Sequence, residues 1–378
     1  MLSFWEKNTL TTYDYIIVGA GIVGLSTAAS IKEQDNNARI LVVERSLFPT
    51  GASTKNAGFA CFGSVSELLD DLTKMPETAV QNLVKERWTG LQLLRKRLGD
   101  QDIGYLNHGG YELIFSKEVE YISHIDKINE LLQPIFQEQV FEQKDALINS
   151  FQFNKEEVKH LIYNKFEAQI DTGAMMDSLL TYVQKKGVRV LTGCEVTQFE
   201  DYDNGVQINI KRPFFQQEIV DFKAKKLLLC TNAFTENLLP NIDLKPGRGQ
   251  VIVTKPIENL PFKGVFHYDE GYFYFRNYGN RIIFGGGRNI DFEGEQTTEF
   301  DNTPIIMKAL KTHLSTIISP NQKVEIDHQW AGIMAFGNTK QPIYKEVSPN
   351  IMLGVRLGGM GVAIGSKLGD KLAHWALE

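Results

Sequence analysis

The chain has 378 residues, of which 43% are hydrophobic and 23% charged, the balance of an ordinary globular protein. This length exceeds what one hydrophobic core usually holds, so we expect two lobes. A net charge of -6 argues against nucleic acid as a partner, because its phosphates need a basic surface. The short basic stretches KRPFF (211–215) and KAKK (223–226) are interpreted as solvated faces.

Cysteine usage points to a reducing compartment. Cys61, Cys194 and Cys230 form no CxxC pair, so we expect neither a metal site nor a disulfide framework, and we expect a cytoplasmic location. The most apolar early stretch (15–31) lacks the basic start and cleavage site of a signal peptide. It is also too short and too rich in glycine for a membrane span, so we expect no integral membrane segment.

The first predicted elements form a strand–helix–strand unit. YDYIIVG (13–19) has the pattern of a buried strand, IVGLSTAASIKEQ (22–34) of a helix and ARILVVER (38–45) of a second strand. A polar loop that contains glycines, GASTKNAGFACFGS (51–64), follows. Further helices are predicted, in chain order, at 65–72, 76–98, 118–136, 172–187, 303–317 and 367–378. Further strands are predicted at 110–116, 188–193, 195–201, 205–210, 216–222, 225–231, 272–287 (a hairpin), 324–334 and 350–357.

This order predicts an α/β fold, α+β overall. Strand–helix–strand units lie at both ends and in the middle of the chain, with antiparallel segments between them. We expect a Rossmann-like cofactor-binding lobe with an inserted antiparallel-sheet substrate lobe. The first lobe is assigned residues 1–85, 166–238 and 329–378, and the second 86–165 and 239–328.

Residues 19–24 form a GxGxxG motif between the first strand and the first helix. Gly19 allows the tight turn, Gly21 lets the backbone approach a pyrophosphate, and Gly24 lets the helix pack on the strand. Glu44, twenty residues past Gly24, ends the second strand and is placed to accept both ribose hydroxyls of an adenosine. An acid there disfavours a 2′-phosphate, so the motif predicts NAD or FAD rather than NADP.

Two further segments favour a flavin over a nicotinamide. The loop residues Ser53, Thr54, Lys55 and Asn56 offer hydrogen bonds to a phosphate or a flavin edge. GVRLGGMGVAIG (354–365) places five glycines directly before the closing helix, where bare N–H groups stabilise negative charge. An NAD-dependent dehydrogenase remains an alternative, although it leaves this glycine loop unexplained.

Several blocks together resemble one known family. They are YDYIIVGAGIVGLSTA, VVERS, GASTKNAG, DTGAMMDSLLTYVQKKGVRVLTGCEVTQFE, KKLLLCTNAF, PGRGQVIVT, YFYFRNYGNRIIFGGGR, HQWAGIM and LGGMGVAIGSKLGDKLA. In this order they resemble the FAD-dependent D-amino-acid oxidase family, which includes glycine oxidase, sarcosine oxidase and γ-glutamylputrescine oxidase. The blocks SFWEKNTLTTYDY, GASTKNAG and LGGMGV lean toward the γ-glutamylputrescine oxidase-like branch.

The resemblance implies where FAD binds. Val196 would lie on the adenine side, Thr231 and Asn232 at a strand end facing the cofactor, and the closing glycine loop around the N1/O2 edge of the flavin. The residues expected to bind the cofactor are Gly19, Ala20, Gly21, Ile22, Val23, Gly24, Glu44, Arg45, Ser53, Thr54, Asn56, Ala57, Gly58, Val196, Thr231, Asn232, Leu357, Gly358, Gly359, Met360 and Gly361. Relatives attach FAD through a C-terminal cysteine or a histidine near the first loop, and this chain has neither, so noncovalent FAD is expected.

The implied chemistry is oxidation of a C–N bond in an amine or amino acid. A hydride passes from the α-carbon to flavin N5, water hydrolyses the imine, and O2 or another acceptor reoxidises the flavin. Arg276, Arg288 and Arg356 are candidates to hold a substrate carboxylate, and Tyr272 and Tyr274 to close the pocket. Glycine oxidase-like proteins carry arginine just after the WAG motif, where this chain has Ile333 and Met334.

Three other interpretations stay open. A tRNA-modifying flavoprotein is one, although the acidic net charge counts against it. A flavin reductase with two nucleotide sites would need a second GxGxxG, which the sequence lacks. A flavin-binding protein without turnover is the third.

Overall fold

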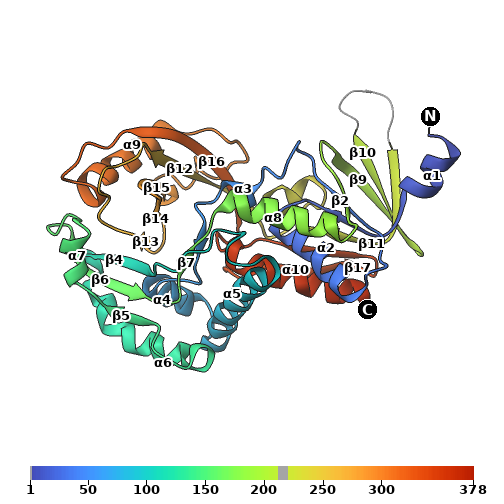
Figure 1. The fold of residues 1–378 in the computed structure, drawn as a ribbon. Coiled ribbons are helices and arrows are strands. Elements are labelled where there is room, and N and C mark those ends of the chain that lie inside the picture. The colour runs from blue at the N-terminus through green and yellow to red at the C-terminus, as the bar shows by residue number, and fades with distance from the viewer. Residues whose placement is uncertain (1, 212–219) are drawn as a thin grey trace.

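The computed structural model describes residues 2–211 and 220–378 (Figure 1). Most of the KRPFF stretch and the beginning of the strand predicted at 216–222 lie outside the described residues. The remainder of that strand continues without a break into the strand predicted at 225–231. Together they form one strand, β11 (Val220–Leu229).

A mostly parallel sheet lies in one half of the molecule (Figure 1, right). Its central strand, β1 (Thr12–Val18), pairs in parallel with β2 (Ile40–Val43) on one side and with β11 on the other. The order across the sheet is β17–β18–β11–β1–β2–β8, and β9 and β10 extend it from β11 as an antiparallel hairpin. The remaining bounds are β8 (Arg189–Leu191), β9 (Glu195–Tyr202), β10 (Gly205–Lys211), β17 (Ile343–Ser348) and β18 (Ile351–Val355).

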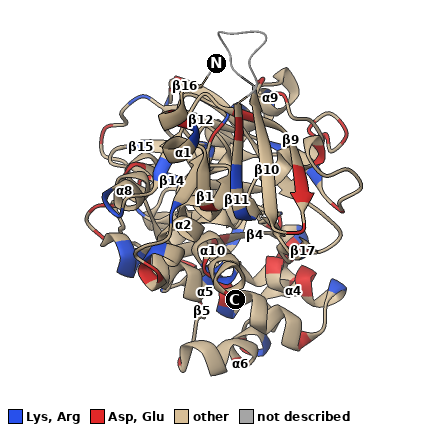
Figure 2. Cartoon of the chain, turned by 90° about the vertical axis from the view of Figure 1, so that its right-hand side faces the viewer, with Lys and Arg blue, Asp and Glu red and all other residues tan. Residues whose placement is uncertain are grey.

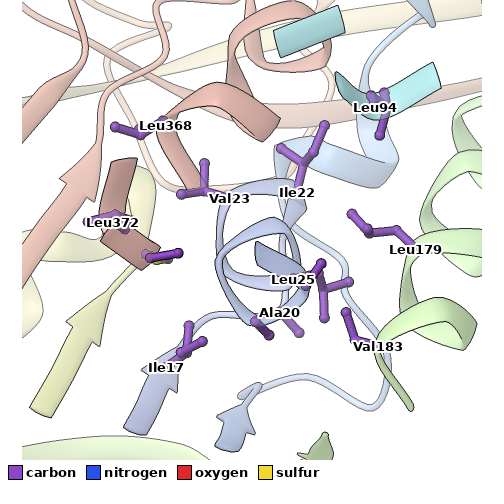
Figure 3. Packing of buried hydrophobic residues seen from close by; sticks show 14 of the residues in the cluster. Ile17, Ala20, Ile22, Val23, Leu25, Leu94, Leu179, Val183, Leu368 and Leu372 are labelled. Carbon is purple, nitrogen blue, oxygen red and sulfur yellow. The ribbon is translucent and has the colours of Figure 1, made fainter. Parts of the chain in front are cut away.

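Three helices cover this sheet: α2 (Ile22–Gln34), α8 (Thr172–Lys185) and α10 (Gly361–Leu377). Leu25 of α2 is fully buried in the core between them (Figure 3). Helices α2 and α10 cross closely, because a Cβ on Gly369 would lie 2.7 Å from the Cβ of Ser26. Strand β1 is apolar in its second half because helices and neighbouring strands shield it, as in other parallel sheets.

A second, mainly antiparallel sheet fills the other half (Figure 1, left). Its strands, in order across the sheet, are β16 (Ile326–Phe336), β12 (Lys245–Thr254), β15 (Arg281–Gly286), β14 (Phe273–Tyr278), β13 (Val265–Tyr268), β4 (Gly110–Phe115), β6 (Val158–Asn164) and β5 (Phe141–Gln143). Stacked phenylalanines fill its core, with the rings of Phe266 and Phe275 4.6 Å apart. The α/β fold with an antiparallel sheet is confirmed, whereas the exact division into two domains stays a prediction.

The remaining elements connect or cover the two sheets. They are α1 (Phe4–Leu10), α3 (Ala52–Lys55), β3 (Phe59–Ala60), α4 (Val65–Lys74), α5 (Glu77–Leu98), η1 (Ser116–His124), α6 (Ile125–Phe136), α7 (Ala146–Ser150), β7 (Ala168–Gln169), η2 (Asn232–Asn237), η3 (Arg288–Ile290), α9 (Pro304–His313) and η4 (Leu314–Ile318). The single helix predicted over 118–136 is wrong in its first half, which is the 3₁₀ segment η1. Several strands lie outside the predicted ones: β3, β5, β6, β7, β12, β13 and β17. The strand predicted at 324–334 is β16, which pairs with β12 in the second sheet.

Charge is mixed over the outer face of the first sheet. Figure 2 shows basic and acidic residues interspersed there, with blue on β11 and red on β9. The KAKK stretch lies on β11, where Lys225 pairs with Asp14 at 2.8 Å and Lys226 lies 4.5 Å from the ring centre of Trp375. The positive charge of this stretch is therefore partly balanced. No helix within the described residues is long and apolar enough to cross a membrane.

Candidate functional site

A cavity of about 540 Å³ is lined by residues of both sheets. Val18 and Val43, at the carboxyl ends of β1 and β2, line the cavity from the first sheet. From the second it is reached by Gly249, His267 and Tyr274. The carboxyl ends of parallel strands are where ligands bind in such sheets, so the cavity lies where the fold expects a site.

The GxGxxG motif forms the turn from β1 into α2. Gly19 has φ +103°, and a Cβ on Gly24 would lie 2.0 Å from the Gly19 carbonyl oxygen, so only glycine fits at position 24. Gly19, Gly21, Ile22 and Val23 line the cavity, whereas Ala20 and Gly24 face the protein. Gly24 therefore has the packing role that the motif predicts, and the other glycines expose backbone to a ligand.

Glu44 closes the motif from the end of β2. Its Oε2 accepts a hydrogen bond from the Ala20 N–H at 3.0 Å, and its Oε1 accepts one from Ser46 N–H at 3.1 Å. The carboxylate lines the cavity although only 9% of the residue is exposed. Each oxygen keeps lone-pair capacity for a ligand hydroxyl, which suits the ribose role expected of it.

The segment after β2 lines the cavity with several residues, among them Ser53 and Asn56. The Ser53 hydroxyl accepts a hydrogen bond from Ile22 N–H at 2.9 Å, at the start of α2. Asn56 uses its side chain internally, accepting from Gly58 N–H at 2.8 Å and donating to two carbonyls of α3. Thr54 and Gly58 do not line the cavity, which corrects their expected cofactor contact: Thr54 Oγ1 donates to Pro49 O, and Gly58 packs against Ile170.

Val196, Thr231, Asn232 and Arg45 all line the cavity, as expected. The guanidinium carbon of Arg45 lies 3.6 Å from the ring centre of Phe234, which also lines the cavity. This contact holds a positive charge at the end of the cavity formed by β2 and η2.

The closing glycine loop forms another wall. Leu357, Gly358, Gly359, Met360 and Gly361 all line the cavity. Helix α10 begins at Gly361, and no side chain caps its N-terminus. Its first N–H groups therefore remain available to a negatively charged ligand edge.

Two of the three candidate arginines are not ligand anchors. Arg276 is 3% exposed, does not line the cavity, and donates to the carbonyls of Ala57 and Ile170. Arg356 donates to Asp243 at 2.6 Å and to the Gln341 carbonyl, also outside the cavity lining. Both hypotheses are corrected, because protein acceptors already occupy the two guanidinium groups.

Arg288 differs from these two. It lines the cavity, and its guanidinium carbon lies 4.0 Å from the ring centre of Phe336 and 5.9 Å from that of Tyr272. No acceptor hydrogen-bonds this guanidinium within residues 2–211 and 220–378. Burial lowers the pKa of Arg288 without neutralising it. Tyr272 and Tyr274 line the cavity beside it, as expected.

Sequence reasoning missed a buried charged group on the same wall. The cavity is also lined by Phe59, Cys61, Glu67 and His267. The first two lie in the loop 51–64, but no role was predicted for them from the sequence, and the last two belong to no recognised motif. Donor atoms of Cys61, Glu167 and His267 lie within 4.8 Å of one another. In the structure, the imidazole and the carboxylate already hydrogen-bond to each other at 3.0 Å.

Comparison with known proteins identifies the family. The sequence model of the family described as FAD dependent oxidoreductase (DAO) matches residues 14–375. The chain belongs to this family of FAD-dependent oxidoreductases. The match resolves the choice of cofactor in favour of FAD over NAD. No curated protein matches the chain.

Solved structures share the fold of this FAD-dependent oxidoreductase. Glycine oxidase from Geobacillus kaustophilus superposes with a TM-score of 0.79 at 15% identity, over 97% of this chain and 95% of that one. L-proline dehydrogenase from P. horikoshii gives 0.76 at 15%, over 96% and 93%. Iminodiacetate oxidase from Chelativorans sp. BNC1 gives 0.72 at 17%, over 96% and 95%. At these identities the likeness concerns the fold.

The cavity suits FAD by its donors and shape. The same cavity is lined by the exposed backbone of Gly21, the carboxylate of Glu44 and the uncapped N-terminus of α10. These groups would hold the pyrophosphate, the ribose and an electron-rich ring edge, respectively. When bound, the flavin supplies the two-electron redox chemistry of this oxidoreductase.

Proposed function

We propose that this FAD-dependent oxidoreductase oxidises the C–N bond of an amine that also carries a carboxylate, such as an amino acid. The observation that carries this proposal is the unpartnered guanidinium of Arg288 on the cavity wall. A half-buried arginine without an acceptor gains much from a carboxylate, which it binds through two parallel hydrogen bonds. The names of the structural neighbours, which include glycine oxidase and proline dehydrogenase, point to the same substrate class.

The protein's own part in this reaction is positioning. Arg288 would fix the carboxylate, and the aromatic rings of Tyr272, Tyr274 and Phe336 would flank the substrate and exclude water. The uncapped N-terminus of α10 would stabilise the negative charge that develops on the cofactor. O2 or another small acceptor would then take the electrons. The mixed surface charge supports a small-molecule substrate rather than nucleic acid.

Anaerobic flavin bleaching tests the proposal. The holoenzyme is mixed with glycine, sarcosine, proline, D-amino acids and γ-glutamylated polyamines, and the absorbance of oxidised flavin is followed. Bleaching by an amine with a carboxylate, but not by the corresponding amine without one, is expected. If no member bleaches a flavin that dithionite still reduces, the proposed function is wrong.

A further inference from the structure

His267 stands on the cavity wall with one ring nitrogen engaged and the other free. Its Nε2 lies 3.0 Å from Oε2 of Glu167, and both residues are buried. Its Nδ1 hydrogen-bonds to nothing in the described part of the chain. The ring is held from the side by Phe59, whose ring centre lies 5.2 Å away and edge-on. The imidazole therefore has a fixed orientation and a vacant donor–acceptor position.

Carboxylates surround this imidazole from three elements. Glu167 precedes β7, Glu67 lies on α4, and Glu112 lies on β4. Burial lowers the pKa of His267, but these carboxylates outweigh it and raise the pKa to about 9. The other titratable groups facing the cluster, the Cys61 thiol and the Tyr274 hydroxyl, have pKa values raised by burial and stay neutral.

The neighbouring carboxylates are already engaged by the protein. Glu67 Oε2 accepts from Ser64 N–H at 3.0 Å, at the start of α4. Glu112 accepts from Val65 N–H at 3.0 Å and from the Ser66 hydroxyl. Two cations also face Glu67, namely Lys340 and Arg87 of α5, and Arg87 donates to the Phe62 carbonyl. Within this cluster, His267 thus combines a place on the cavity wall with a ring nitrogen that no described protein group engages.

We propose that His267, oriented by Glu167, takes the proton of the substrate ammonium before the C–N bond is oxidised. This inference rests on the proposed function and names a catalytic residue for it. Amines arrive as ammonium ions, whose nitrogen has no lone pair to form the C=N bond. Binding of the ammonium displaces the Nδ1 proton of His267 to solvent, and Nδ1 of the neutral ring then accepts the ammonium proton, while the proton on Nε2 stays directed at Glu167.

The step balances in protons and electrons. The N–H bond of the ammonium breaks, its electron pair stays on nitrogen, and the proton forms a new bond to Nδ1. The nitrogen lone pair then forms the C=N bond as the α-carbon hydrogen leaves as hydride with its electron pair. The electron pair would pass to FAD, the cofactor of the family, which would serve as the oxidant when bound. The proton taken up by His267 restores the protonated imidazole of the free enzyme, and it passes to solvent when the next substrate ammonium binds.

Proton release on ligand binding gives a test that needs no turnover. The probe is 2-aminoisobutyrate, which has an amine and a carboxylate but no α-hydrogen. Near pH 7.5 both the free ammonium and the free imidazole are protonated, and their complex retains one shared proton. Binding to the holoenzyme, seen as a shift in flavin absorbance, should therefore release about one proton per site into weakly buffered indicator solution.

Variants assign the proton to His267. His267→Gln should bind the probe with almost no proton release. His108→Gln, which changes a half-buried imidazole outside the cavity lining, should behave as the wild type. Binding without proton release in the wild type, or equal release in the wild type and His267→Gln, would overturn the inference. So would one divalent metal ion per purified chain whose binding is lost in His267→Gln.

The pH profile of flavin reduction separates this step from a structural role. With an amine that bleaches the wild type, His267→Gln should reduce the bleaching rate at pH 7.5 by about 10²–10⁴-fold. The rate should recover toward the wild-type value at about pH 10, where the amine loses its proton in solution. A parallel loss at all pH values would refute the proton role and leave the proposed function standing. A wild type that no amine bleaches would instead refute the proposed function.

Discussion

Arg248 and Glu295 form a buried two-point ion pair. Nε and Nη2 of the arginine each lie 2.9 Å from a carboxylate oxygen, and Gln250 donates to the same carboxylate at 2.8 Å. Glu295 lies in the segment between η3, which starts at Arg288, and α9. The pair therefore ties that segment to β12 and fixes the region from which Arg288 faces the cavity.

Removing one partner of this pair should destabilise the protein strongly. Glu295→Gln leaves the Arg248 charge buried without its counter-ion, so the free energy of unfolding should fall by about 3–5 kcal/mol in urea titrations. The control is Glu325→Gln, which breaks the exposed Lys255–Glu325 pair and should leave the free energy of unfolding nearly unchanged. Equal losses in the free energy of unfolding for the two substitutions would show that burial does not strengthen the contribution of the Arg248–Glu295 pair.

Arg288→Met should weaken binding of a substrate carboxylate. The loss of charge-assisted hydrogen bonds worth about 1.5–3 kcal/mol should raise the Kd by roughly 10- to 150-fold. The Kd is measured by titrating the holoenzyme with 2-aminoisobutyrate and monitoring the flavin absorbance. Arg281→Met is the matched control, because Arg281 pairs with Asp327 away from the cavity. An unchanged Kd in Arg288→Met would show that Arg288 does not bind a substrate carboxylate.

Gly24→Ala should disrupt the cofactor turn. The new Cβ would lie 2.0 Å from the Gly19 carbonyl oxygen, so α2 must shift away from β1, at a cost of about 1–3 kcal/mol or more. FAD content after purification should fall, as measured by absorbance. Gly173→Ala serves as the control, because Gly173 lies on α8 outside the cavity lining and the nearest atom to its Cβ position is 3.4 Å away. Full FAD occupancy in Gly24→Ala would contradict this account.

FAD should be released when the holoenzyme is precipitated with acid. All three cysteines line the cavity, yet burial raises the pKa of each thiol, that of Cys230 to about 12. The thiols therefore stay protonated and are poor nucleophiles toward the flavin. A yellow supernatant over a colourless pellet is expected, and colour that stays with the pellet would show a covalent bond.

Stability should decline as the pH rises from about 5 to 9. The pKa of Glu112 is raised by burial to about 7 from 4.5, and that of His267 to about 9 from 6.5. The folded state therefore holds protons that the unfolded chain has already released, and raising the pH removes this advantage. Urea titrations with saturating FAD at a series of pH values should show this decline in the free energy of unfolding. Glu112→Gln should flatten the decline between pH 4.5 and 7, and a flat wild-type profile would contradict both shifts.

The cofactor half of the site follows from local sequence. Gly19 to Gly24 and Glu44 act within one strand–helix–strand unit, so their spacing along the chain fixes their spacing in space. The closing loop is similar, because its glycines directly precede the helix whose N-terminus they expose. The local sequence therefore predicted the fold class, a dinucleotide cofactor and the backbone that faces it, and the family match decided for FAD over NAD.

Only the tertiary structure decided which side chains are free to meet a substrate. Arg276 and Arg288 stand twelve residues apart in one hairpin region, yet carbonyls from distant segments occupy the first and leave the second unpaired. Glu167 and His267 are separated by 100 positions and meet where β13 passes the segment before β7. Hydrogen-bond partners of this kind depend on how separate elements pack, and neither composition nor spacing encodes them directly.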